Sequence, residues 1–203
     1  MSKETTMLET TVPEQPSSEQ IREFVIAGHS NLEKVKTLLA ELPGLLNVAQ
    51  PWSESDHETA LQGAAHVGNV AIVEYLLAQG APLDICTAAM LGRQAAVERF
   101  VQSDANALQA TGGHGIPLLT HASLSGNVAL VQWLVQQGVQ SGISAALHNA
   151  VSRGYPELVR WLLENSSPDL AWKNFQGKTA LTVATENGDA LNEQLLRAHG
   201  ATE

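Results

Sequence analysis

The stretch GNVAIVEYLLAQGA at residues 68–81 decides the fold, because its pattern returns along the chain. A valine follows the first glycine by five residues and a leucine follows it by eight, so both lie on one face of a helix. A second glycine, Gly80, stands where a helix ends in a left-handed conformation. A small residue marks the equivalent starting position in six places: Ser30, Gly68, Gly92, Gly126, Gly154 and Gly188.

The same spacing holds across these copies. Five residues after the small residue stands valine, with one exception at Glu193: Val35, Val73, Val97, Val131 and Val159. Four residues before it the side chain is apolar and mostly alanine: Ile26, Ala64, Ala88, Ala122, Ala150 and Ala184. One helix pair cannot bury its own apolar face, so the copies must stack on one another. The sequence therefore predicts an all-α helical repeat solenoid of about six helix–turn–helix units.

The residues also carry a family resemblance. Residues 145–150, AALHNA, resemble the Thr-Pro-Leu-His-x-Ala box of the ankyrin family, and residues 59–64 and 179–184 are looser versions of it. The stretch at 68–81 resembles the second helix of that family and its exit. The resemblance implies a single ankyrin-repeat domain at 19–203 with short β-hairpin-like fingers. Its repeats are expected at approximately 19–45, 57–82, 83–106, 115–140, 143–168 and 177–203.

The spacing of the copies is uneven. Connections long enough for a finger lie at 43–58, 105–116 and 167–178, whereas only a short turn fits after Gly80 and after Gly138. This alternation of long-fingered and fingerless repeats resembles a subset of bacterial ankyrin proteins, so we expect a bacterial source. Residues 1–18 are polar and contain two prolines, which predicts a disordered N-terminal tail.

Composition excludes several partners. The 203 residues carry a formal net charge of −10, and lysine and arginine appear singly, so a surface for nucleic acid or anionic membrane is not expected. No apolar run reaches membrane-spanning length, and no secretory signal precedes the repeats. The one cysteine, Cys86, cannot form an intramolecular disulfide. We expect a cytoplasmic monomer.

Catalytic and metal-binding patterns are not recognisable along the chain. The seven histidines are distributed over different repeats, without H-x-x-x-H or C-x-x-C spacing. Residues 112–115, GGHG, lack the pattern of a phosphate-binding loop and are interpreted as a flexible finger tip. Cys86 is expected to be buried and inert, and His148 to make structural hydrogen bonds. The sequence predicts no cofactor, no metal, no catalytic residue and no enzyme activity.

The resemblance implies where a partner would bind. The helix positions that line the groove in this family correspond to His66, Val67, Met90, Leu91, Leu124, Ser125, Ser152, Arg153, Glu186 and Asn187. The finger candidates are Trp52, Asp56, His114, Trp172, Lys173 and Phe175. Met90, Leu91 and Leu124 are expected to form an exposed apolar patch in the middle of the groove. Two alternatives stay open: Met90 is buried beneath its neighbours, and the finger aromatics pack on adjacent fingers.

These features predict a non-catalytic protein–protein interaction module that binds another protein through its concave groove and finger loops. The alternative is a dedicated inhibitor or regulatory subunit of one enzyme, with the acidic charge steering a basic partner. An enzyme is the third class, and only scattered histidines and serines favour it.

Overall fold

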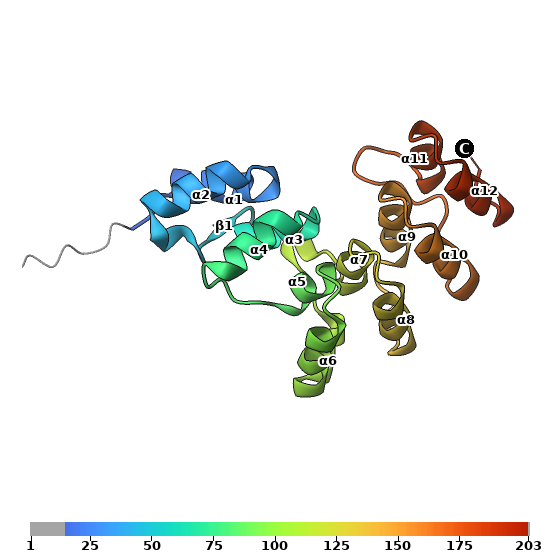
Figure 1. Cartoon of the computed structure of the whole chain (residues 1–203), viewed down its shortest axis with the longest axis horizontal. Coiled ribbons are helices and arrows are strands. Elements are labelled where there is room, and N and C mark those ends of the chain that lie inside the picture. The colour runs from blue at the N-terminus through green and yellow to red at the C-terminus, as the bar shows by residue number, and fades with distance from the viewer. Residues whose placement is uncertain (1–14, 203) are drawn as a thin grey trace, which may run out of the picture.

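The computed structural model describes residues 15–202, and in that range twelve α-helices form six consecutive pairs (Figure 1). The pairs are α1 (Ser18–Ser30) with α2 (Leu32–Glu41), α3 (Ala60–His66) with α4 (Val70–Ala78), α5 (Ile85–Met90) with α6 (Gln94–Ser103), α7 (Leu118–Ser123) with α8 (Val128–Gln136), α9 (Ile143–Ser152) with α10 (Pro156–Asn165), and α11 (Ala180–Glu186) with α12 (Ala190–Ala198). The predicted fold class is confirmed. Most of the predicted tail, residues 1–14, lies outside the described residues.

Side-chain caps set the helix starts. Ser17 accepts a hydrogen bond from the backbone amide of Gln20, and the Gln20 side chain accepts one from the amide of Ser17. Thr59 and Gln62 form the same reciprocal box at the start of α3. Such boxes satisfy amide groups that the first helical turn leaves without a partner. Local sequence therefore determines where these helices begin.

The first helices of the pairs lie side by side and form the inner surface of an arch (Figure 1). The pairs α1–α4 and α9–α12 make its two arms, and α6 and α8 project from the outer side. Small residues permit this close stacking. A Cβ atom added at Gly28 of α1 would lie 2.7 Å from the carbonyl oxygen of Ala60 in α3. The arrangement creates a concave space between the two arms.

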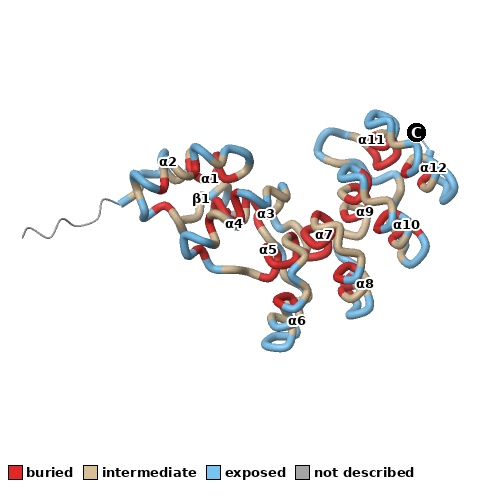
Figure 2. The backbone as a smooth tube through the Cα atoms, in the orientation of Figure 1, coloured by how far each residue is buried: buried red, intermediate tan, exposed pale blue. Residues whose placement is uncertain are grey.

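The core consists of two clusters of buried side chains. Figure 2 shows buried residues along the helices of both arms and of the middle of the arch. The five valines of the repeated position are fully buried, as their spacing predicts. The predicted exposed patch is wrong for two of its three residues. Met90 is 1% exposed and Leu124 is 8% exposed, and both belong to the N-terminal cluster; Leu91 is half-buried. Because α5 contacts both α3 and α7, the end of α5 is covered by its neighbours.

The three long connections differ. The first contains a hairpin of β1 (Ala49–Pro51) and β2 (His57–Thr59), with Ala49 opposite Thr59. The second contains an isolated bridge between Thr111 and Pro117 and the short 3₁₀ turn η3 (Gly113–Gly115). The third, at 167–178, is closed by a hydrogen bond from the Asn174 amide to the Lys178 carbonyl. Two further 3₁₀ turns, η1 (Pro43–Leu45) and η2 (Ala105–Gln109), follow α2 and α6. Within residues 15–202, no helix has the length and apolar character needed to cross a membrane.

Candidate functional site

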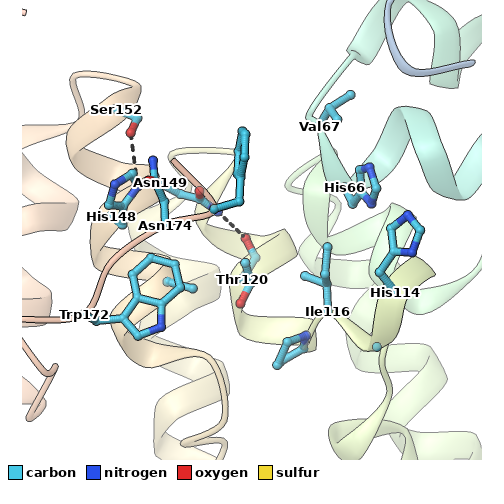
Figure 3. Close-up of a pocket in the computed structure, with 14 residues that line it drawn as sticks. His66, Val67, His114, Ile116, Thr120, His148, Asn149, Ser152, Trp172 and Asn174 are labelled. Carbon is cyan, nitrogen blue, oxygen red and sulfur yellow. Dashed lines mark hydrogen bonds between the residues drawn. The ribbon is translucent and has the colours of Figure 1, made fainter. Parts of the chain in front are cut away.

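A cavity of about 630 Å³ lies on the concave side of the arch, between its two arms (Figure 3). Its walls come from the end of α3, from residues 114–117 before α7, from one face of α9, and from the third finger. Segments from four different repeats therefore meet at one place. The volume falls in the range of about 300–1,000 Å³ typical of sites that bind small molecules or inserted side chains.

One face of α9 forms the side of the cavity that belongs to the C-terminal arm. Ala145, His148, Asn149 and Ser152 recur at the spacing that places them on one helix face. The Asn149 side-chain amide donates a 3.2 Å hydrogen bond to the carbonyl oxygen of Thr120 (Figure 3). The Ser152 hydroxyl lies 3.3 Å from Nδ1 of His148. Burial lowers the pKa of His148, so this ring favours its neutral form. The resulting surface is uncharged and is tied together by these contacts.

The third finger supplies two aromatic side chains to the cavity. The Trp172 ring packs edge-on against His148, with ring centroids 5.5 Å apart. Phe175 is 96% exposed, although it lines the same space. Trp172 is thus held by an intramolecular contact, whereas the Phe175 ring has almost its whole surface in water. A large apolar side chain in this state is a common feature of binding surfaces.

A group of histidines surrounds Glu58 beside this cavity. The Glu58 carboxylate, on β2, is fully buried. Its Oε2 lies 3.6 Å from Nε2 of His29 and 3.3 Å from Nε2 of His114, and its Oε1 lies 3.4 Å from Nδ1 of His66. The indole of Trp52 donates a 2.9 Å hydrogen bond to the same Oε2. Within the described residues, this is the group of histidine and carboxylate side chains whose positions suit a metal ion.

In two of the three imidazoles, the ring nitrogen that does not face Glu58 makes its own hydrogen bond. Nδ1 of His114 donates to Oδ2 of Asp56 across 2.6 Å, and the His114 backbone amide donates to Oδ1 of the same carboxylate. Nδ1 of His29 lies 3.0 Å from the carbonyl oxygen of Val25. The hydrogen bond with His114 lowers the pKa of Asp56. Burial, with the nearby His29 and His114, lowers the pKa of His66 to about 4.

The predicted contact residues divide between several environments. Those that line the cavity are His66, Val67, His114, Ser152, Trp172 and Phe175. Arg153 does not line it but joins the arms, because its guanidinium donates to the carbonyl oxygen of Val67. Trp52 and Asp56 belong to the histidine group, and Trp52 packs beside His114 of the next finger. The remaining predicted residues do not line the cavity: Met90, Leu91, Leu124, Ser125, Lys173, Glu186 and Asn187.

The sequence did not predict several residues of the cavity, nor His29 and Glu58 of the histidine group. The cavity is also lined by Ile116, Thr120, Ala145, Asn149 and Asn174. The helical spacing of residues 145, 148, 149 and 152 could have indicated the α9 face. Spacing along the chain gives no sign of the histidine group, whose members come from three separate repeats and whose metal-binding potential arises only on folding.

Comparison with family models identifies the repeats. A model described as ankyrin repeats in three copies matches residues 85–171 and 119–202, and a single ankyrin-repeat model matches residues 56–88. A comparison with curated proteins gives no match.

Proposed function

Because the chain belongs to the ankyrin-repeat family, whose members are in general protein–protein interaction modules, we propose that it binds another protein in the cavity between its arms. Ankyrin-repeat domains are typically non-catalytic binding scaffolds, and we propose the same role for this chain. The observation that carries the proposal is Phe175, which is 96% exposed at the edge of a 630 Å³ cavity. A partner that covers this ring removes a large apolar surface from water.

The cavity walls indicate what the partner presents. Val67, Ile116 and Trp172 offer apolar surface, while Asn149 and Asn174 offer hydrogen-bonding groups. No lysine, arginine or carboxylate stands among the lining residues. This combination suits an apolar side chain of the partner, held in place by hydrogen bonds to its backbone.

The proposal is tested with a displayed peptide or protein library, using the full chain as bait. Selected binders are measured again on Val67→Glu and on Phe175→Ala. We expect both changes to weaken binding at least tenfold, because truncating an aromatic hot spot costs about 2 kcal/mol or more, and Glu at position 67 places a charge in the apolar wall. Leu191→Ala is the matched control, since Leu191 is a large apolar residue 47% exposed on α12, away from the cavity. Binders that lose affinity for Leu191→Ala and keep it for Phe175→Ala would place the interaction on another surface.

A second candidate function is supported by the charge. A net charge of −10 favours association with a basic protein, as expected for a dedicated inhibitor or regulatory subunit of one enzyme. Affinity purification that recovers one enzyme in a one-to-one complex, with its activity altered on binding, would favour this reading. Several unrelated partners of similar affinity would favour a general interaction module.

We propose a bacterial source from the alternating finger pattern, a cytoplasmic location from the composition, and a monomeric state. Sedimentation analysis of the purified chain tests the last of these, and a self-associating species at micromolar concentration would contradict it.

A further inference from the structure

We propose that Glu58, His29, His66 and His114 bind a single zinc ion. Each of the four side chains offers one ligand atom, and these atoms lie within 4.8 Å of one another. They come from three separate parts of the chain: α1, the consecutive elements β2 and α3, and η3. Three imidazoles with one carboxylate suit zinc and its neighbours among the transition metals, whereas magnesium and calcium prefer oxygen ligands alone.

The spacing of the ligand atoms fits a tetrahedral ion. With zinc–ligand bonds of about 2.0–2.1 Å, neighbouring ligand atoms stand about 3.4 Å apart. Oε2 of Glu58 lies 3.3 Å from the His114 ring and 3.6 Å from the His29 ring, and Oε1 lies 3.4 Å from the His66 ring. The remaining pairs of ligand atoms lie within 4.8 Å of one another, so binding an ion would draw the side chains together by up to about 1.4 Å.

Two of the ring nitrogens that face Glu58, Nε2 of His29 and Nε2 of His114, carry lone pairs. A carbonyl oxygen can only accept a hydrogen bond, so the bond from His29 to Val25 places the proton on Nδ1 and leaves Nε2 free. The carboxylate of Asp56 has the same effect on His114. A histidine that ligates a metal ordinarily donates its other ring nitrogen to a carboxylate or carbonyl in this way.

Two polar atoms inside the group have no hydrogen-bond partner: Oε1 of Glu58 and Nδ1 of His66. Both are buried, and they lie 3.4 Å from each other. A buried polar atom without a partner costs free energy, so a pair that faces each other requires an explanation. One cation between them satisfies both.

The backbone around the four side chains has an unusual conformation at His114 and glycine at two positions of close approach. His114 has φ of 57°, a left-handed conformation that is unfavourable for a residue with a side chain, and Asp56 binds both its amide and its ring. A Cβ atom at Gly113 would come within 2.7 Å of Oε1 of Glu58, and one at Gly63 within 2.8 Å of the His29 ring. Glycine at both positions keeps the space next to the ligands open. The partly exposed ring of His114 gives an ion a path from solvent.

The experiment uses the full chain, freed of metal with EDTA and then dialysed. Zinc is titrated by calorimetry, thermal unfolding is followed with and without zinc, and cobalt replaces zinc for absorption spectroscopy. We expect one ion per chain, a melting temperature that rises with zinc concentration, and the intense visible absorption of tetrahedral cobalt. Glu58→Gln and His114→Gln should each abolish the cobalt absorption.

Asp56→Asn tests the positioning of His114 without removing a ligand. Loss of such an outer partner typically weakens metal binding by about 10–100-fold, and we expect a decrease of that size in zinc affinity. His57→Gln is the matched control: His57 is exposed and lies beside Glu58 on β2, but outside the ligand group. It should bind zinc as the parent does.

Circular dichroism in EDTA tests whether each variant folds without metal. If Glu58→Gln does not fold, His114→Gln carries the test, because this ring is partly exposed. Absence of saturable zinc binding to the parent would overturn the proposal. Equal binding by the parent and by folded His114→Gln would also overturn it, and would leave the group as a hydrogen-bonded network.

Discussion

The guanidinium group of Arg153 donates a 2.7 Å hydrogen bond to the backbone carbonyl oxygen of Val67, 86 residues earlier in the chain. Arg153 follows α9 in the C-terminal arm, and Val67 follows α3 in the N-terminal arm. A solenoid repeat ordinarily contacts only its neighbours. This bond instead crosses the concave side of the arch, next to the cavity to which Val67 contributes. The distance between the two arms, and with it the width of the candidate binding site, therefore depends in part on the exposed side chain of Arg153.

Arg153→Ala is therefore expected to loosen the arch without unfolding it. One exposed hydrogen bond contributes about 1 kcal/mol or less, so the melting temperature should change little. Spin labels on cysteines introduced at Val70 and Glu157, both exposed, report the distance between the arms. The distance distribution should broaden in Arg153→Ala and stay unchanged in Arg160→Ala, an exposed arginine on α10. Identical distributions in all three proteins would show that stacking alone fixes the arch.

Met90→Ala tests the burial of a residue whose sequence position predicts exposure. Met90 is 1% exposed inside the N-terminal core cluster, so its truncation leaves a cavity. We expect a loss of about 2–5 kcal/mol in the free energy of unfolding, measured by urea denaturation. Val70→Ala, at a site 51% exposed, should change that free energy by no more than about 0.5 kcal/mol. Equal effects of the two changes would argue against the burial of Met90.

His121 should make the fold sensitive to acid. Burial lowers its pKa in the folded chain; the carbonyl oxygen of Pro117 and the charge of Asp84 oppose this in part. The unfolded chain binds the proton first, near pH 6.5, so the free energy of unfolding falls as the pH drops below that value. The loss ends once the pH is below the pKa of the folded state.

The measurement is denaturant unfolding between pH 5 and 8 in EDTA, so that metal binding does not contribute. The slope attributable to one histidine is at most on the order of 1 kcal/mol per pH unit. His121→Gln should have a shallower slope than the parent over this window. A slope in His121→Gln as steep as in the parent would rule out this source of acid sensitivity.

Cys86 should be chemically inert in the folded chain. Burial raises the pKa of its thiol to about 12, with a smaller contribution from Asp84, so the reactive thiolate is rare at neutral pH. We expect a thiol reagent such as DTNB to react slowly under native conditions and rapidly in denaturant. Ala89→Cys, another buried position on α5, should behave in the same way, whereas Arg160→Cys should react at once. Fast labelling of Cys86 in the native chain would indicate local opening of α5.

The repeats could be predicted because their information is local. The 5-and-8 spacing of valine and leucine fixes a helix face, and glycine permits the left-handed ends observed at Gly80, Gly138 and Gly200. The capping box at Ser17 likewise depends only on neighbouring residues. Six copies that cannot bury their faces alone have to stack, so the sequence by itself determined the helix pairs and the solenoid.

Tertiary structure decided the rest, because a site depends on distances between repeats. The direction and degree of bending determine that Val67 meets Arg153, that Met90 is covered, and that Phe175 lies beside α9. The meeting of His29, His66 and His114 around Glu58 depends on the same packing. Each repeat contributes one or two of these side chains. The distances between them depend on the small rotations that relate each helix pair to the next, added along the arch. Spacing along the chain carries no record of that sum.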